Sequence, residues 1–311
     1  LGLEQLMDVD VTSVSKKEQR LSQVAAAVYV ITREDIRRSG ATSIPEALRM
    51  APGVQVSRID ASKWAVSVRG FNGRWSNKLL VLMDGRSVYT PMFSGVYWDV
   101  QDTFLEDIER IEVIRGPGGT MWGANAVNGV VNVITRHARD TQGGLLTAGG
   151  GSEELGFGGA RYGGNAGKVY YRGYAKLFQR NHLTNASGAP AADDWNALRG
   201  GFRMDWEPSE RDAVTLQGDL YQNHAGGTVA TFSLRPPFSG RSDYRVAASG
   251  GNVLARWKRV LSERSETVVQ IYFDRTHNHG ASYSEEVNTC DLEFQHLVKL
   301  GSRHDMQWGL G

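Results

Sequence analysis

The sequence predicts a mainly β protein, in which a small α+β domain is followed by the antiparallel strands of a transmembrane β-barrel. The stretch from Ile108 to Arg136 contains two alternating apolar strands on either side of a glycine-dense segment. Before this stretch, short strands alternate with short helices. From Thr141 onward, polarity alternates with a period near two and no helical pattern is present. Such a change of pattern indicates a domain boundary.

Composition excludes several other classes of protein. The 35 Lys and Arg residues nearly balance the 34 Asp and Glu residues, which argues against a nucleic-acid-binding protein. No apolar run is long enough for a membrane-spanning helix, whereas barrel strands alternate and keep mean hydropathy low. Cys290 is the single cysteine, so no disulfide framework or cysteine metal site is expected. Because the chain starts at Leu1 without a leader, we expect a mature or shortened piece.

Capping signals predict two short helices in the first domain. Thr32 with Asp35 has the spacing of a capping box, and Gly40 is expected to end that helix. A second start signal at residues 43–46 (SIPE) predicts a helix that ends at residues 52–53. The strands expected around these helices are Ala25 to Ile31, Val54 to Val56, Ala65 to Arg69 and Leu79 to Met83, the last followed by the hairpin signal Asp84-Gly85.

The second part of the chain has the pattern of an outer-membrane barrel. Its strands run to roughly ten residues, which exceeds the usual 5–6 of soluble sheets and suits tilted membrane strands. Short turns such as residues 163–167 alternate with long connections, among them residues 183–194 and 225–241. We expect about eight or nine strands from Thr141 to Gly311. A closed barrel of about eight strands could not enclose a domain, so we expect the front part of a longer barrel.

Four motifs, in this order, resemble the plug domain of the TonB-dependent outer-membrane receptors. They are VYVITREDIRRSGATSIPEALRMAPGV (28–54), SVRGFNGR (67–74), LLVLMDGRSVY (79–89) and IERIEVIRGPGGTMWGANAVNGVVNVIT (108–135). The combination is specific, whereas the barrel part resembles the family only in style and position. The resemblance implies an N-terminal extended segment at 1–15, a plug domain at 16–137 and barrel strands at 138–311, in a family whose barrel has 22 strands.

This resemblance implies a function in transport rather than catalysis. The expected activity is TonB-dependent uptake of a scarce, large nutrient across the bacterial outer membrane, with a ferric siderophore as the expected substrate. Cobalamin, haem or oligosaccharide receptors and signal-transducing receptors of the same family are alternatives, and a soluble β-rich binding protein is the alternative from another class. No catalytic set, cofactor or metal site is expected. The implied partners are TonB with its inner-membrane energising complex, outer-membrane lipid, a metal chelate or other small molecule, and bacteriocins or phage.

The plug tips that face the ligand in this family correspond to residues 58–64, 71–77 and 92–98. These tips combine cationic and aromatic side chains, which suits an anionic, partly planar ligand such as a catecholate or carboxylate iron chelate. Packing of the same aromatics against a barrel wall is the alternative. The predicted contacts are Arg58, Lys63, Trp64, Arg74, Trp75, Phe93, Tyr97 and Trp98.

The resemblance also assigns a latch and a strip that contacts TonB. Arg69 and Arg115 correspond to arginines that pair with barrel carboxylates, whose positions in the family lie later than residue 311. Residues 116–119 are expected to form a backbone corner and not a phosphate loop, because no Gly-Lys-Ser/Thr follows. The strip is expected at Asp8, Val9, Asp10, Val11 and Thr12, although these residues suit the plug's own first strand equally. For His277 and His279, with His224 distant in the sequence, a haem or metal site at an extracellular loop is one alternative, and simple exposure in the loop is the expected one.

Overall fold

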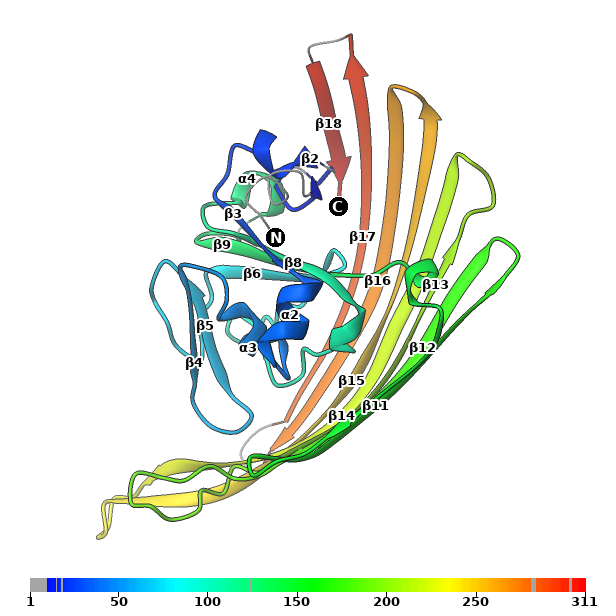
Figure 1. Ribbon diagram of the computed structural model, residues 1–311. Helices are drawn as coiled ribbons and strands as arrows, with labels where there is room; N and C mark the ends of the chain where they lie inside the picture. The colour runs from blue at the N-terminus through cyan, green and yellow to red at the C-terminus, as the bar shows by residue number, and fades with distance from the viewer. Residues whose placement is uncertain (1–9, 15, 18, 124, 281–283, 302–303) are drawn as a thin grey trace. The chain divides into compact units, whose positions relative to one another are not determined.

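The computed structural model describes the chain except residues 1–9, 15, 18, 124, 281–283 and 302–303 (Figure 1). The chain divides into two compact units, Leu1–Arg136 and His137–Gly311. The first unit is mixed α and β, and the second is built on an antiparallel sheet. The predicted fold class, a small plug-like domain followed by the strands of an incomplete barrel, is confirmed.

The stretch that begins at Ile108 forms the centre of the first unit. β8 (Ile108–Ile114) and β9 (Gly129–Thr135) pair antiparallel at inner positions of a five-stranded sheet with the order β3-β8-β9-β6-β7. The remaining strands are β3 (Val28–Thr32), β6 (Leu79–Met83) and β7 (Arg86–Ser87). β6 and β9 run parallel and are buried along most of their length, which explains their continuous apolar sequences.

Two small sheets and short helices complete this unit. β1 (Asp10–Val11) pairs with β2 (Gln19–Arg20), and β4 (Val54–Arg58) pairs with β5 (Trp64–Val68). The helices are η1 (Leu21–Gln23), α2 (Arg33–Ser39), α3 (Ile44–Leu48), η2 (Leu105–Asp107) and α4 (Gly119–Trp122). The sequence predicted only a backbone corner around α4. The segment instead closes a helical turn, in which Trp122 N donates to Gly118 O at 2.9 Å.

The helix-capping predictions succeed at α2 and fail in part at α3. Thr32 and Asp35 form the reciprocal capping box, and Gly40 ends α2 with a φ of 70°. Ser43 makes no side-chain cap at the start of α3, and its hydroxyl oxygen is buried without a hydrogen-bond partner in the described structure. Four of the five residues of α3 are buried, so apolar packing stabilises this helix more than its cap does.

The second unit starts with the short helix η3 (Ala138–Thr141), followed by a sheet in which each strand pairs antiparallel with the next. Within the described residues, β10 and β18 are the two edges of this sheet. Its nine strands are β10 (Gly143–Gly149), β11 (Glu154–Ala166), β12 (Val169–Arg180), β13 (Trp195–Trp206), β14 (Asp212–Phe232), β15 (Ser239–Ser262), β16 (Ser265–Gly280), β17 (Ser284–Leu300) and β18 (His304–Leu310).

Two predictions about connections in this unit are wrong. Residues 225–241 were expected to form a long loop, but β14 and β15 continue through most of them and leave only residues 233–238 as the connection. The stretch TVATF (228–232) is rich in β-branched and aromatic residues, which favour a strand despite the glycines before it. His277 and His279 lie in β16, and His224 lies in β14, so none of the three is a loop residue.

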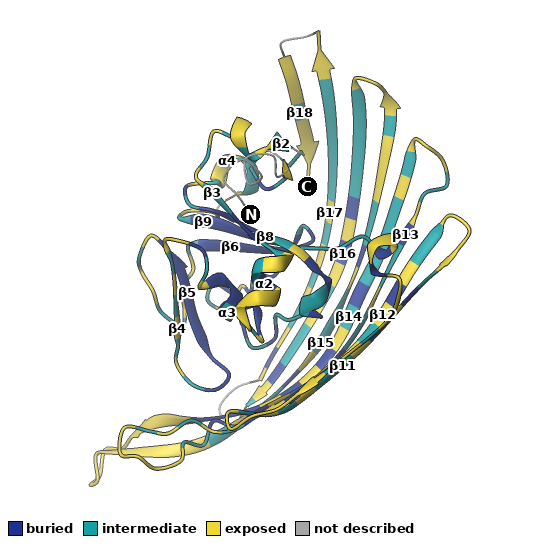
Figure 2. Ribbon diagram, viewed as in Figure 1, coloured by how far each residue is buried: buried dark blue, intermediate teal, exposed yellow. Residues whose placement is uncertain are grey.

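The sheet of the second unit has exposed apolar residues and buried polar ones. In β12, Tyr171 and Leu177 are exposed, whereas Arg172 and Arg180 are buried. Figure 2 shows exposed and less exposed positions alternating along these strands. A soluble sheet would bury its apolar face, so the exposed apolar face is the one that contacts lipid.

Tryptophans lie on the apolar face near the short turns. Trp206 and Trp257 are both register partners of Val214, and Trp308 pairs with His296 near the turn between β17 and β18. All three tryptophans are exposed. Aromatic residues at this level are typical of the girdle that a barrel places at the membrane–water interface.

None of the helices in the described part of the chain is both long enough and apolar enough to span a membrane.

Candidate functional site

Aromatic residues from two loops of the first unit meet in one cluster. The ring centroids of Trp75 and Phe93 are 4.7 Å apart, and those of Phe93 and Tyr97 are 5.0 Å apart. Trp75 and Tyr97 are 6.4 Å apart, and all three pairs are edge-to-face. This geometry is favourable because the positive edge of one ring meets the negative face of another. The structure therefore joins two of the three predicted tips, 71–77 and 92–98.

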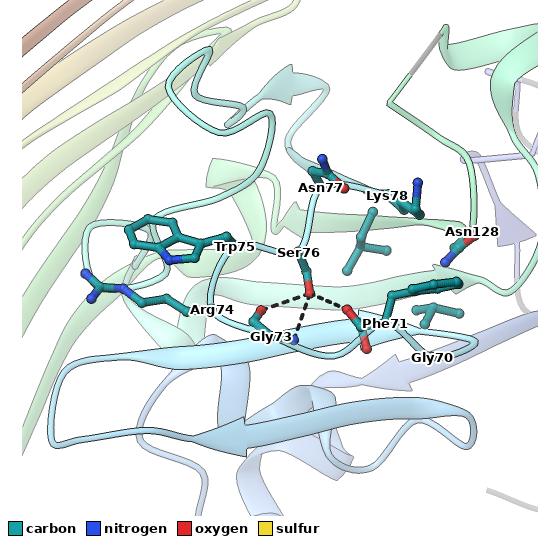
Figure 3. Close-up of a pocket in the computed structure, with 12 residues that line it drawn as sticks. Gly70, Phe71, Gly73, Arg74, Trp75, Ser76, Asn77, Lys78 and Asn128 are labelled. Carbon is teal, nitrogen blue, oxygen red and sulfur yellow. Dashed lines mark hydrogen bonds between the residues drawn. The ribbon is translucent and has the colours of Figure 1, made fainter.

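Ser76 fixes the shape of the first of these loops. Its hydroxyl oxygen accepts a hydrogen bond from Gly73 N at 3.1 Å and lies 2.9 Å from the carbonyls of Phe71 and Gly73, either of which can accept its proton (Figure 3). Arg69, Gly70 and Phe71 have consecutive positive φ angles of 59°, 93° and 57°. Two of these residues are not glycine, so the loop starts in an unfavourable backbone state that Ser76 helps to hold.

Gly95 allows the second loop to approach the first. A Cβ atom at this position would lie 2.5 Å from the carbonyl oxygen of Ser76 and 2.4 Å from the ring of Phe93. Both distances are below van der Waals contact, so any side chain would push the loops apart. Trp98 lies in the same loop and is only 7% exposed, so it packs inside the unit and is not open to a ligand.

A pocket of about 280 Å³ opens at the first loop (Figure 3). The Arg74 guanidinium lies 4.4 Å over the ring of Trp75, and the Lys78 ammonium lies 5.9 Å from the ring of Phe71. Phe71 and Trp75 are themselves exposed. The pocket is lined by Ser67, Val68, Gly70, Phe71, Gly73, Arg74, Trp75, Ser76, Asn77, Lys78, Leu79 and Asn128, among which there is no acidic residue. This lining favours a flat ligand group that carries negative charge.

The end of the β4–β5 hairpin is packed and does not form an open tip. Lys63 is 8% exposed and forms an ion pair with Asp60 at 2.5 Å. Trp64 is 2% exposed and donates its indole N–H to Glu46 at 3.0 Å. Arg58 donates to the carbonyl of Asp60 at 3.1 Å, and its guanidinium lies 5.7 Å from the ring of Trp64. These three predicted ligand contacts therefore stabilise the hairpin, and the structure does not bring them to the pocket.

Two carboxyl groups near these cations have shifted pKa values. Burial raises the pKa of Asp99, and the nearby charges of Lys63 and Arg74 lower it only in part. Burial also acts to raise the pKa of Glu46. Hydrogen bonds from Arg49 and from the indole of Trp64 outweigh this effect, so the pKa of Glu46 is lowered overall. The cations near the hairpin thus have carboxyl groups close by, and one of these cations, Arg74, also lines the pocket.

The two predicted latch arginines lie at one corner of the first unit. Arg115 Nη1 donates to the carbonyl of Pro52 at 3.2 Å. Arg69 is exposed, and a side chain at Gly116 would meet its guanidinium at 3.8 Å. Neither arginine forms an ion pair with a residue that the structure describes. Their pairing with barrel carboxylates stays a prediction.

A buried carboxylate holds the N-terminal strip. Glu112 is 0% exposed and accepts hydrogen bonds from the backbone N–H groups of Thr12 and Ser13, at 3.0 and 2.8 Å, and from the Ser13 hydroxyl at 2.5 Å. Trp122 donates its indole N–H to the Ser13 carbonyl at 2.6 Å, and Val11 is buried. Of the predicted TonB contacts, Asp10 and Val11 form β1 and Thr12 follows it, whereas Asp8 and Val9 lie outside the described residues. The described part of the strip is packed as the first strand of this unit.

Strand pairing brings three histidines to one face of the second unit. His224 pairs with Ala247, which pairs in turn with His279. The rings of His277 and His279 are 6.4 Å apart. Within the described residues, no group of three or more His, Cys, Asp or Glu side chains is arranged to hold a metal ion.

Sequence reasoning missed three residues that shape the first unit, namely Ser76, Gly95 and Glu112. Glu112 carries the clearest signal, because it is a charge in the middle of the apolar strand IERIEVI. Period-two alternation places it with Arg110 on the polar side of β8, which suggests exposure. The strip that covers Glu112 belongs to a distant part of the sequence, so the alternation could not reveal its burial.

A sheet of long antiparallel strands with an exposed apolar face is typical of an outer-membrane β-barrel protein, and here it follows a separate α+β unit in the chain. Residues 20–130 match the family described as TonB-dependent Receptor Plug Domain. Residues 20–130 are therefore a TonB-dependent receptor plug domain, and the findings support a TonB-dependent receptor with this plug and part of its barrel.

Curated relatives and solved structures agree with this assignment. The chain is 35% identical over 151 residues to a vitamin B12 transporter BtuB of Vibrio vulnificus, an alignment that covers 48% of this chain and 24% of the relative. A BtuB of Photobacterium profundum is 37% identical over 147 residues, which cover 47% of this chain and 23% of the relative. The matches thus span about a quarter of these relatives.

The fold is similar to that of outer-membrane receptors for iron chelates. The ferripyoverdine receptor of the outer membrane of Pseudomonas aeruginosa superposes with a TM-score of 0.76 at 15% identity, over 97% of this chain and 44% of that chain. The ferric-catecholate import receptor Fiu of E. coli K12 superposes with a TM-score of 0.66 at 18% identity, over 91% of this chain and 48% of that chain. At these identities the likeness concerns the fold alone.

Proposed function

We propose that the protein imports a scarce, bulky nutrient through the bacterial outer membrane in a TonB-dependent manner. The observation that carries this proposal is the TonB-dependent receptor plug domain in one chain with lipid-facing barrel strands. In this proposal residues 1–15 include the strip that contacts TonB, residues 16–137 form the plug and residues 138–311 belong to the barrel. Arg69 and Arg115 latch the plug to barrel carboxylates, and the protein acts in transport and not in catalysis.

For the substrate we propose an anionic, partly planar metal chelate of the siderophore type. The pocket at residues 67–79 supports this choice, because it combines Arg74 and Lys78 with exposed aromatic rings, and none of the described residues that line it is acidic. Delocalised negative charge on a catecholate or carboxylate chelate complements such a lining. Of the eight predicted contacts, the proposal now rests on Arg74 and Trp75, with Phe93 and Tyr97 as their packing partners.

Cobalamin is the second candidate substrate. It is supported by curated relatives that are vitamin B12 transporters and are 33–37% identical to this chain over about half its length. These alignments cover less than a quarter of each relative, so most of the barrel of those transporters is not compared. Bacteriocins remain proposed partners, since a fold neighbour has been solved as a complex with pyocin S2.

Uptake by the full-length protein tests these proposals. A strain that lacks the gene is complemented with wild type or with the double substitution Arg74→Ala/Lys78→Ala, and uptake of a ferric catecholate and of cobalamin is measured with and without functional TonB. We expect TonB-dependent uptake of the chelate, and about tenfold weaker apparent affinity in the double variant. The control Arg37→Ala/Arg38→Ala removes two exposed cations of α2 and should leave uptake unchanged.

The outcomes separate the candidates. Uptake of cobalamin alone would reject the chelate and support the second candidate. Uptake that continues without TonB would contradict the proposed energy source. Equal uptake in the pocket variant and the α2 control would show that the pocket does not bind the substrate.

A further inference from the structure

The second unit starts with a turn that is fastened to the polar face of its own sheet. η3 lies against β11, β12 and β13. Ala138 and Thr141, the two ends of η3, are buried. Tyr170 of β12, Asp205 of β13 and Thr215 of β14 are register partners and form one row across three strands. Residues far apart in sequence therefore converge where the chain enters the sheet.

Asp205 is the centre of this arrangement. It is 1% exposed, and its Oδ2 accepts hydrogen bonds from Ala138 N at 2.7 Å and from Arg203 Nε at 2.8 Å. Its Oδ1 accepts from Thr215 Oγ1 at 2.7 Å and from Arg203 Nη2 at 3.1 Å. His137 Nδ1 lies 3.7 Å from the same carboxylate. Four hydrogen bonds thus hold Asp205 in one orientation, with an oxygen on the first amide of the turn.

Other side chains hold the rest of the turn. The carbonyl of Ala138 accepts hydrogen bonds from Thr141 Oγ1 at 3.1 Å and from Gln142 Nε2 at 2.7 Å. Arg139 donates to Glu207 of the β13–β14 connection, and its guanidinium lies 5.3 Å from the ring of Tyr170. Side chains therefore bind both polar backbone groups of Ala138. Residues of β12 and β13 supply many of the contacts that hold the turn.

The side chain that caps the Ala138 amide comes from an unusually distant part of the sequence. Amides at the start of a helix have no partner within it, and neighbouring residues normally satisfy them. His137 does so for Arg139. The amide of Ala138 is instead bonded to Asp205, which lies 67 residues later. A local cap would stabilise only the turn, whereas this bond ties the turn to β13, the fourth strand of the sheet.

The strand after the turn needs such support. β10 is an edge strand in the described sheet and has seven residues, GGLLTAG, of which three are glycine. It pairs with β11 alone among the described strands. Glycine-rich edge strands are weakly held, so a displacement of residues before 137 would peel β10 away unless the chain were stopped first.

We propose that Asp205, which Arg203 and Thr215 hold in place, anchors the turn at residues 138–141. A movement of the plug would then stop at this turn and would not be transmitted to the barrel strands. The proposal rests on the proposed function only in assuming that the plug moves. Asp205 is a positioning residue, which acts through the Ala138 amide and not on a ligand. The anchor needs no metal, cofactor or covalent step.

Hydrogen exchange of the full-length protein in detergent tests this anchor. The substitution Asp205→Ala should speed exchange of the amides at 138–141 by about 10- to 100-fold, because it removes a charge-assisted hydrogen bond from a buried amide. Thr215→Val removes one donor to Asp205 but keeps the bond to Ala138, so exchange should stay close to wild type. If Asp205→Ala does not fold, Asp205→Ala/Arg203→Gln avoids a buried unpaired arginine and serves in its place.

Asp219 provides a matched control. It is another carboxylate on the polar face, in β14, bonded to Arg199 and Asn252 and not to the turn. Asp219→Ala should leave exchange at 138–141 unchanged. The proposal is overturned if Asp205→Ala exchanges like wild type, or if Asp219→Ala exposes the turn equally. The measurement needs no substrate, so a failure of uptake would reject the proposed function independently of this result.

Discussion

The carboxylate of Glu112 has no contact with solvent, so its charge is stabilised by the hydrogen bonds that it accepts. The N-terminal strip supplies four donor groups, the backbone N–H and hydroxyl groups of Thr12 and Ser13, and Arg110 Nε supplies another at 2.8 Å. The substitution Glu112→Ala removes these bonds and leaves Arg110 without this partner. We expect it to destabilise the plug by about 3–5 kcal/mol and to release residues 10–14. Glu112→Gln preserves the shape but removes the charge, and should have an intermediate effect.

Limited proteolysis and chemical unfolding of the full-length protein measure these effects. Cleavage within residues 10–14 should be faster in Glu112→Ala than in wild type before global unfolding starts. Protection of this strip in the alanine variant would mean that Val11 and the indole of Trp122 hold it without the carboxylate.

At the scale of elements, the two aromatic loops depend on a close approach at Gly95. We expect Gly95→Ala to separate the loops, because its Cβ would overlap Ser76 O and the ring of Phe93. The cost should be about 1–3 kcal/mol of plug stability, together with weaker substrate binding. Gly73 offers a matched control in the same pocket, since a Cβ there meets nothing within 4 Å and the residue has no positive φ.

The melting temperature and substrate affinity of the two glycine variants show whether an added methyl group acts only at the crowded position Gly95 or anywhere in these loops. Gly73→Ala should behave as wild type in both measurements. If Gly95→Ala also matches wild type in affinity, the contact between the loops does not shape the binding site.

Local signals in the sequence predicted much of the fold but less of the site. The capping box at Thr32, the hairpin at Asp84-Gly85 and the strands around Ile108 follow from residues within a few positions of each other. Lys63 and Trp64 were predicted as ligand contacts because residues 58–64 correspond to a ligand-facing plug tip of the family and contain cationic and aromatic side chains. Their burial depends on Asp60 and on Glu46, of which Glu46 comes from another element. The anchor at Asp205 likewise depends on strand pairing that no local pattern predicts.

At the scale of the whole molecule, the two units show opposite relations between polarity and burial. The first unit buries apolar side chains such as Ile111 and Val131, as a water-soluble domain does. The second unit exposes apolar side chains such as Leu220, which is 72% exposed, and buries polar ones such as Asp205. One chain thus contains a part suited to water and a part suited to lipid, as expected of a water-soluble plug domain and of membrane-barrel strands.

Strand β17 allows this reversal to be tested within one element. Leu292 is exposed on the apolar face, whereas Thr289 lies on the opposite, polar face. We expect Leu292→Arg to cost about 2–4 kcal/mol, because it places a charge in the hydrocarbon region. Thr289→Arg adds the same side chain to the same strand on the polar face and should be tolerated. Heat-modifiable electrophoretic mobility of the full-length protein in isolated outer membranes reports the folded fraction of each variant. Comparable folding of both variants would contradict the lipid-facing assignment. A loss of folding confined to Thr289→Arg would show that the face of Thr289, and not that of Leu292, contacts lipid.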